Sequence, residues 1–294
     1  MEIGLVLTMF IQTDQSITGN LINQLLPILE QASNLLNNEY ENYISGNQLD
    51  IQKKTDESPV TQADLKINHF LVTELARITP DYPVLSEEGD NTQRCSWNIC
   101  WMLDPLDGTK EFIQQRDEFT INLSLIEDSY TSFSVIVVPR EQQMYIGYTH
   151  ELPYKYQFNS KQWWRYHHSI ESLNNTIQVG LSHRSKSNKY QKFIKYLESD
   201  YKIVCREAGS AYKFCMMLEG KIDFYPRFHP TSEWDTSAGQ ALLESIGGGL
   251  VSLNGIPFKY NVRTTVLNQG FIAYSKSEYR HLVLELLQQI DFSN

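Results

Sequence analysis

The sequence is organised around residues 101–112, which read WMLDPLDGTKEF. The apolar run from Ile99 to Leu103 predicts a strand that stops at Asp104, and a second carboxylate, Asp107, follows three residues later. Magnesium prefers oxygen ligands and usually takes a few carboxylates together with water and phosphate oxygens. The stretch therefore suits a hard divalent cation, although a strand that ends in an Asx-turn would by itself explain a DxxDGT pattern.

The residues around the two aspartates suit the same chemistry. Pro105 stiffens the bend, and Leu106 can turn its backbone carbonyl inward as a neutral oxygen ligand. Gly108 and Thr109 open a predicted helix, where backbone N–H groups can meet a phosphate.

Three further segments place acidic side chains at the ends of predicted elements: SPVTQAD at 58–64, LSEE at 85–88 and SEWDTSAG at 232–239. Each has an ordinary structural explanation, since Thr61 and Ser232 can cap helices and Asp64 and Asp235 favour the positive end of a helix dipole. Together with the aspartate pair, the three segments make an acidic metal cluster the better interpretation.

The pattern of the first half of the chain predicts two helices followed by consecutive strands. Strands joined by short connections indicate a mainly antiparallel sheet, so we expect an α+β lobe over residues 1–165, with Ser16 or Thr18 capping the first helix. The expected elements are helices over 16–43 and 61–78 and strands over 84–86, 99–103, 119–126, 133–138, 144–149 and 155–159.

The second half alternates strands with helices, which predicts an α/β lobe over residues 170–294. The expected strands cover 176–181, 202–206, 222–225, 249–253 and 270–274, and the expected helices cover 188–198, 210–219, 232–246 and 276–290.

Charge and composition exclude several classes of protein. The 294 residues carry a net charge of −10, and a protein that coats DNA or RNA needs clustered cations. The apolar stretch from Ile3 to Ile11 is shorter than a membrane span of ~18 residues and lacks the basic flank of a secretory signal. We expect it to be a poorly ordered tail, or the true start to lie at Met9.

The four cysteines have no zinc-ligand spacing, which predicts buried free thiols and a cytoplasmic protein: Cys95, Cys100, Cys205 and Cys215.

Other catalytic chemistries find no support. The sequence contains neither a GxSxG nucleophile elbow nor a GxxxxGK[ST] phosphate loop. The seven histidines do not have the spacing of metal ligands. We expect His183 and His229 to line the cleft around the acidic segments. We expect Lys53 and Lys54 to be surface residues.

In this order, the four acidic segments resemble the inositol monophosphatase superfamily of magnesium-dependent, lithium-sensitive phosphatases, over residues 20–275. More narrowly, the chain is similar to the bacterial 3'(2'),5'-bisphosphate nucleotidases in SPVTQAD, PVLSEE, DPLDGTKEFI and GSAYKFCMMLEGKIDFYPRF followed by EWDTSAGQA. Residues 110–112 read KEF where inositol phosphatases typically have Thr-Asn-Phe. Two departures are the GSA at 209–211, where the nucleotidases commonly have GSS, and the first ~15 residues, which have no family counterpart.

The resemblance implies a layered sugar-phosphatase fold with alternating α-β-α-β-α layers and a site for two or three Mg²⁺ ions. Glu87, Asp104 and the Leu106 carbonyl would hold one ion, and Asp104, Asp107 and Asp235 a second. Asp64 would help to place a third. The catalytic residues would be Asp64, Glu87 and Thr109, with Thr109 orienting the attacking water in concert with Asp64 or Glu87.

The resemblance also implies a substrate, adenosine 3',5'-bisphosphate, a by-product of sulfur metabolism whose 3'-phosphate would be hydrolysed to leave AMP. Besides Glu87, Asp107 and Asp235, the residues expected at the substrate are a phosphate cradle (Leu106, Gly108, Thr109) and a nucleotide pocket (Gly209, Ser210, Lys213, Arg227). No nucleic-acid polymer is expected as a partner. Oligomeric state and a peripheral association with the inner membrane, as some relatives are thought to show, stay open.

Three alternatives compete with this assignment. An inositol monophosphatase or broad-specificity sugar phosphatase would keep the metal site and change the pocket. A fructose-1,6-bisphosphatase shares the superfamily, but the KEF and GSxxK segments argue against it. A non-catalytic scaffold would be expected to have lost a carboxylate, and all five are present.

Overall fold

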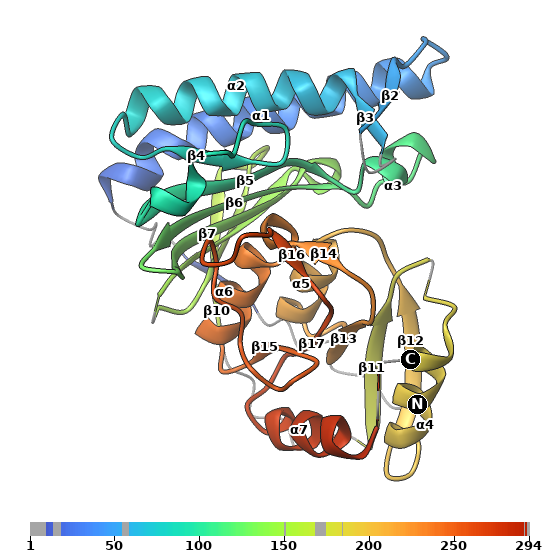
Figure 1. Cartoon of the computed structure of the whole chain (residues 1–294). Helices are drawn as coiled ribbons and strands as arrows, with labels where there is room; N and C mark the ends of the chain where they lie inside the picture. Colours follow the sequence, from blue (N-terminus) through green and yellow to red (C-terminus); the bar gives the residue numbers. More distant parts are fainter. Residues whose placement is uncertain are drawn as a thin grey trace.

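The computed structural model describes residues 10–13, 19–54, 59–149, 151–167, 175–183, 185–290 and 292. Helices α1 (Asn20–Ile44) and α2 (Gln62–Ile78) cover one face of an eight-stranded sheet (Figure 1). Helices α5 (Tyr212–Leu218) and α6 (Ser237–Ser245) lie between that sheet and a five-stranded one. Beyond the second sheet lie α4 (Asn188–Leu197) and α7 (Tyr279–Gln289). The expected α-β-α-β-α layering is confirmed.

The eight-stranded sheet is antiparallel except where β4 runs parallel to β5. Its order is β1 (Phe10–Thr13), β10 (Gln162–Tyr166), β9 (Tyr154–Gln157), β8 (Gln143–Tyr148), β7 (Tyr130–Val138), β6 (Thr120–Glu127), β5 (Ile99–Asp107) and β4 (Val84–Ser86). Side chains on alternate residues of β5 face opposite layers: Trp101 and Leu103 pack with α1 and α2, whereas Cys100 and Met102 pack with α5 and α6. Asp104 therefore continues the face that meets the central helices.

The five-stranded sheet is mixed. Its order is β12 (Lys202–Glu207), β11 (Thr176–Leu181), β13 (Phe224–Arg227), β17 (Phe271–Tyr274) and β15 (Gly249–Ser252). The first three strands are parallel and the last three antiparallel. Two small pairs complete the described strands: β2 (Ile51–Lys53) with β3 (Pro59–Thr61), and β14 (Thr231–Ser232) with β16 (Leu267–Asn268).

Helix α2 begins where the sequence predicts. Thr61 is its N-cap: the Thr61 hydroxyl accepts hydrogen bonds from the backbone N–H groups of Ala63 and Asp64, and the Asp64 carboxylate accepts one from the Thr61 N–H. The buried stripe of Ile67, Leu71 and Leu75 then follows at helical spacing. The cap fixes Asp64 at the end of the helix that lies nearest the acidic segments.

Several expectations require correction. Of the apolar stretch from Ile3 to Ile11, Phe10 and Ile11 belong to an edge strand, Phe10–Thr13, that pairs with β10, so these two residues are not a tail; the rest of the stretch lies outside the described residues. Strand β5 does not stop at Leu103 but continues to Asp107, and the third strand of the second half covers 224–227 instead of 222–225. The expected helix over 232–246 is a 3-10 turn, Glu233–Asp235, followed by α6, because the Asp235 carboxylate is held by Thr231 and Ser232 outside a helical ladder.

The expected cap of the first helix and the expected burial of the cysteines also need comment. The caps Ser16 and Thr18 fall outside the described residues, and α1 begins after Gly19 without a side-chain cap. All four cysteines are free, but Cys95 and Cys205 are exposed, so only Cys100 and Cys215 fit the expectation of buried thiols.

One of the hydrophobic clusters joins the two sheets. It includes Cys100, Met102 and Ile136 from the first sheet and Phe214 and Leu242 from α5 and α6. The division into lobes 1–165 and 170–294 therefore stays a prediction, with α5 and α6 packed against both sheets. Among the helices of the described residues, none is both long and apolar enough to span a bilayer.

Candidate active site

The two aspartates of β5 share one face because the strand contains a bulge. In a regular strand, residues three apart point to opposite faces. Here Asp104 pairs with Asn122 and Asp107 with Thr120, so three steps along β5 match two steps along β6. The extra residue turns both carboxylates toward the central helices.

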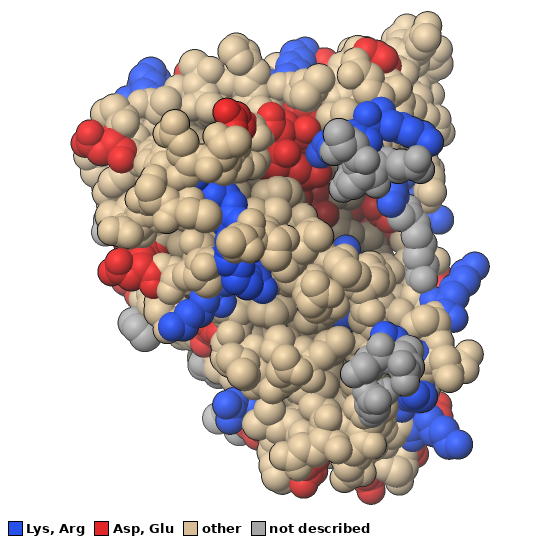
Figure 2. Space-filling model, in the orientation of Figure 1, with Lys and Arg blue, Asp and Glu red and all other residues tan. Residues whose placement is uncertain are grey.

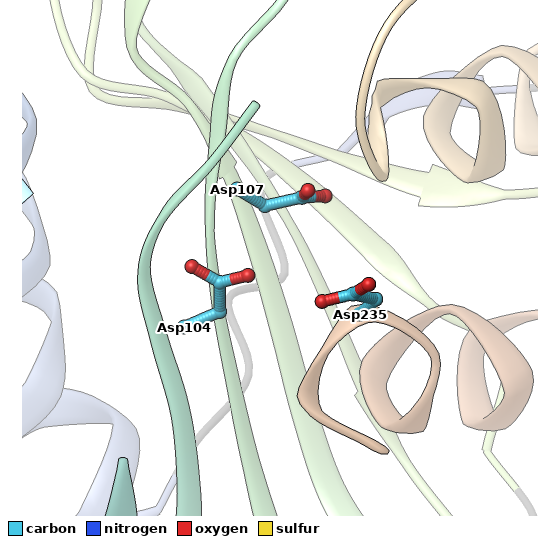
Figure 3. Close-up of side chains that lie close together, drawn as sticks. All are labelled: Asp104, Asp107 and Asp235. Carbon is cyan, nitrogen blue, oxygen red and sulfur yellow. The ribbon is translucent and has the colours of Figure 1, made fainter. Parts of the chain in front are cut away.

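Asp235 completes a group of three carboxylates. It lies in the 3-10 turn before α6, where the Thr231 hydroxyl and the Ser232 N–H donate to its Oδ2 atom. One oxygen from each of Asp104, Asp107 and Asp235 lies within 4.8 Å of the others. Figure 3 shows the three carboxylates pointing into one common space from β5 and from the turn before α6.

The electrostatics of this group call for a cation. Burial raises the pKa of Asp104 well above its usual range, and the charges of Glu87, Asp107 and Asp235 raise it further. Burial, followed by the charge of Asp235, raises the pKa of Asp107 to about 6. Burial also raises the pKa of Asp235, against the opposing effect of Arg227. Oxygen donors that are costly to keep ionised without a counter-charge fit a hard divalent ion.

Glu87 lies beside the group and is paired with a lysine ammonium. Its backbone N–H donates to the Leu103 carbonyl of β5 at 3.1 Å. The Lys54 ammonium lies 2.6 Å from Glu87 Oε1 and 2.5 Å from Glu88 Oε1. The expectation that Lys54 is a surface residue was wrong, because its side chain is 20% exposed and reaches the site. Lys53 is exposed, as expected.

Asp64 and Thr109 form a separate pair at the start of α3 (Thr109–Ile113). The Thr109 hydroxyl lies 3.0 Å from Asp64 Oδ1 and 3.2 Å from the Leu106 carbonyl oxygen. The other oxygen of Asp64 accepts from the N–H and hydroxyl of Thr61. Burial raises the pKa of Asp64, against the hydrogen bonds that it accepts.

A cavity of about 190 Å³ opens over these groups. Nine of the expected site residues line it: Glu87, Asp107, Gly108, Thr109, Gly209, Ser210, Lys213, Arg227 and Asp235. Asp64, Asp104 and Leu106 are buried and do not belong to the lining. The expected cleft residues His183 and His229 do line it. Figure 2 shows acidic side chains gathered in a hollow on one face of the molecule.

The Gly209-Ser210 turn is tied to the aspartates. The Ala211 N–H donates to Asp107 Oδ2, and Ser210 Oγ lies 3.1 Å from the Thr120 hydroxyl. Ser210 has a positive φ of 50°. A Cβ atom on Gly209 would lie 2.4 Å from Glu111 Cγ, so only glycine fits without movement of Glu111.

Lys213 supports this turn from behind. Its ammonium donates to the carbonyl oxygens of Ala208 at 2.8 Å and Ser210 at 2.9 Å, and it lies 4.6 Å from the centre of the Tyr225 ring. Burial lowers the pKa of Lys213 to about 8, against the charge of Asp107. Two of its three N–H bonds are therefore used inside the protein.

Arg227, the last residue of β13, also lines the cavity. Its Nη2 atom lies 4.0 Å from Asp235 Oδ2 and 3.4 Å from the Pro230 carbonyl oxygen. Its Nε–H is buried and has no hydrogen-bond partner within the described part of the chain. His229 Nδ1 lies 3.3 Å from the same Pro230 oxygen.

Sequence reasoning missed Glu118, which connects the two sides of the cavity. Its Oε2 atom accepts from the Gly209 N–H at 2.8 Å and lies 2.6 Å from His183 Nε2. Its only local signal is a position directly before an apolar strand, and that signal does not reveal a partner 91 residues away.

The chain is similar to known proteins over most of its length. The profile of the inositol monophosphatase family matches residues 20–291. A 3'(2'),5'-bisphosphate nucleotidase CysQ from Salmonella typhimurium is 34% identical over 255 residues, which is 83% of this chain and 98% of that protein. The corresponding Buchnera aphidicola protein is 32% identical and covers 90% of this chain and 97% of its own length.

Solved structures show the same fold. The crystal structure of CysQ from Bacteroides thetaiotaomicron, a bacterial member of the inositol monophosphatase family, has a TM-score of 0.69 at 30% identity and covers 84% of this chain and 94% of its own. The suhB protein from Bartonella henselae shares the fold, with a TM-score of 0.72 at 19% identity over 92% of this chain and 99% of its own. From its profile match, its relatives and its layered architecture, the chain belongs to the inositol monophosphatase family.

Proposed function

We propose that the chain is a magnesium-dependent 3'(2'),5'-bisphosphate nucleotidase that hydrolyses the 3'-phosphate of adenosine 3',5'-bisphosphate to AMP and phosphate. The observation that carries the proposal is a group of three carboxylates, of which Asp107 and Asp235 line one cavity together with basic and polar side chains. The similarity to proteins named CysQ supports the choice of substrate. We further propose a cytoplasmic location; the comparisons give no support for membrane association.

Two or three magnesium ions would be held by the acidic side chains. Asp104, Asp107 and Asp235 have the spacing for a shared ion. Glu87 with the Leu106 carbonyl would hold a second ion beside Asp104, and Asp64 would help with a third. When bound, such ions activate water and neutralise phosphate charge.

Thr109 and Asp64 would orient the attacking water. If the Thr109 hydroxyl donates its one hydrogen bond to Asp64 Oδ1, at 3.0 Å, its oxygen lone pairs are left to accept a hydrogen bond from the water. The helix cap at Thr61 holds the Asp64 carboxylate where it can accept this bond. Gly108, with a φ of 92°, brings the backbone of the Leu106–Thr109 cradle close to the phosphate.

The nucleotide would lie along the Gly209-Ser210 turn, with its second phosphate toward Arg227. A phosphate entering a protein of charge −10 needs a cation, and the unpartnered Arg227 Nε–H can donate to it. Lys213 would contribute through the turn that it supports with its bonds to the Ala208 and Ser210 carbonyl oxygens.

The test is phosphate release from adenosine 3',5'-bisphosphate, inositol-1-phosphate and fructose-1,6-bisphosphate, with magnesium and with a chelator. The proposal requires magnesium-dependent release that is fastest for the nucleotide, and Asp107→Asn should retain less than about a tenth of the activity. Faster release from inositol-1-phosphate would assign the chain to the monophosphatases instead.

Arg227→Ala tests the pocket. Losing one charge-assisted contact worth about 1.5–3 kcal/mol lowers kcat/KM about 10- to 150-fold, and we expect this for the nucleotide, against less than about threefold for inositol-1-phosphate. The matched control is Arg77→Ala, whose guanidinium is 63% exposed and pairs with Glu74 on α2. Equal losses on both substrates would place Arg227 in the support of Asp235 and not in the nucleotide pocket.

A further inference from the structure

The segment that follows β13 is shared between two cavities. Arg227 and His229 line the active-site cavity. Phe228 and Pro230, the alternate residues of the same segment, line a second cavity of about 590 Å³ on the other side. Any shift of this segment therefore changes both walls together.

Aromatic rings hold the segment on the side away from the active site. Phe228 is 6% exposed, and its ring contacts those of Tyr190, Phe193 and Phe292. Its ring centre is 4.8 Å from that of Tyr190, at 62°, and 4.4 Å from that of Phe292, at 11°. The Tyr190 hydroxyl also accepts a hydrogen bond from the Phe228 N–H at 3.4 Å.

Phe292, like Phe228, belongs to no helix or strand. It follows α7, which ends at Gln289, and it is 5% exposed. Its parallel stack on Phe228 is the closest ring contact of the cluster. The second cavity lies beside Phe228 and Pro230, so on this side the aromatic rings are the packing that holds the segment.

We propose that Phe292 is a positioning residue for the substrate pocket: its ring, stacked on Phe228, fixes residues 227–230 and so sets where Arg227 and His229 stand over the active-site cavity. The inference rests on the proposed function for its choice of substrate. Its structural part, the position of the segment, is independent of that function.

The variant is Phe292→Ala, with Phe292→Tyr as the conservative rescue, since the cavity that Phe292 lines has room for a hydroxyl. Leu287→Ala is the control, because Leu287 belongs to the same cavity wall but carries no ring to stack. Loss of the stack should raise KM for adenosine 3',5'-bisphosphate about 3- to 10-fold. The value of kcat should change less than about twofold, because the carboxylates are untouched.

Hydrogen–deuterium exchange of the peptide over residues 227–233 gives a readout that needs no turnover. We expect faster exchange there in Phe292→Ala, and wild-type exchange in Phe292→Tyr and Leu287→Ala. Unchanged exchange in Phe292→Ala, or an equal rise of KM in Leu287→Ala, would overturn the inference. If Phe292→Ala does not fold, Phe292→Leu removes the ring while keeping the apolar volume, and the same outcomes apply.

The two proposals fail differently. If the wild-type protein hydrolyses another phosphate ester better, the proposed function is wrong, and the exchange experiment still decides the role of Phe292. If the wild-type protein is a nucleotidase but Phe292→Ala matches it in exchange and KM, only the positioning role is wrong.

Discussion

Asp107→Asn should make the metal-free protein more stable while removing its activity. The pKa of Asp107 is raised from 3.8 to about 6 by burial and then by the charge of Asp235. At 1.36 kcal/mol for each pKa unit, keeping this carboxylate ionised in the folded, metal-free protein costs about 3 kcal/mol. Asparagine is neutral and has the same shape, so the variant avoids this cost.

The hydrogen bonds of the site should survive the substitution. The Ala211 N–H and the Asn122 amide both donate to the same atom, Asp107 Oδ2. An asparagine that places its carbonyl oxygen there keeps both bonds and points its NH₂ group toward the other carboxylates. We therefore expect a net gain of about 2–3 kcal/mol in the free energy of unfolding at pH 8 without metal.

The gain should depend on pH with a defined sign. Below the unfolded pKa, near 4, the carboxyl is protonated in both the folded and the unfolded state, so the penalty is absent. Above the folded pKa, about 6, it is ionised in both, and the penalty is complete. The wild-type protein should thus lose stability relative to Asp107→Asn as pH rises from 4 to 6, with about half of the difference present at pH 5.

Urea unfolding in the presence of a chelator, at pH 5 and pH 8, measures this difference. Asp81→Asn is the control, because Asp81 is exposed after α2 and should show no gain. Saturating magnesium should reverse the order at pH 8, since metal binding stabilises only a protein that retains its ligands. The reasoning is refuted if the metal-free variant is no more stable than wild type at pH 8, or if the gain is the same at both pH values.

Three other substitutions follow from the same site. Lys54→Met should lower the Tm of the metal-free protein, because Glu87 and Glu88 would lose the ammonium between them. Magnesium should restore most of the lost Tm, and an equal Tm deficit with and without magnesium would contradict this. Lys213→Met should cost about 2–3 kcal/mol in urea unfolding, because two buried carbonyls lose their donor, and should impair all phosphate esters alike; a loss confined to the nucleotide would instead show direct contact with substrate. Glu118→Gln should keep one oxygen for the Gly209 N–H but weaken the contact with His183, so KM for the nucleotide should rise about threefold while the urea midpoint stays near wild type; an unchanged KM would remove Glu118 from the substrate pocket.

The sequence predicts those parts of the fold that depend on local patterns. The stripe of α2 and its Thr61 cap, strand β4, and the apolar first half of β5 are all visible in short windows. In each of these elements the apolar residues recur with the period of a helix or a strand, and the element is bounded by a residue with a known capping or turn preference. The same windows bring the acidic segments to the right ends of their elements.

The missed features all depend on residues far apart in the sequence. The contact of Lys54 with Glu87 spans 33 positions and that of Glu118 with Gly209 spans 91, and neither leaves a local pattern. Strand β1 looks like an isolated apolar stretch until β10 supplies its partner. The break between Asp235 and α6 is set by hydrogen bonds to the Asp235 carboxylate, which outweigh the helical propensity of the surrounding residues.

Because the site's aspartates lie on β5, their positions depend on how the same strand packs in the core. Cys100, Met102 and Asp104 lie on one face of the strand, and Trp101 and Leu103 on the other. A slip of one residue would bury the aspartates under α1 and α2 and at the same time turn the indole of Trp101 toward the central helices. Selection against misfolding and selection for the carboxylate geometry therefore act on the same strand register. Changes that preserve this register can accumulate in the loops around the cavity without displacing the acidic centre, which leaves substrate preference free to vary from one member of such a family to another.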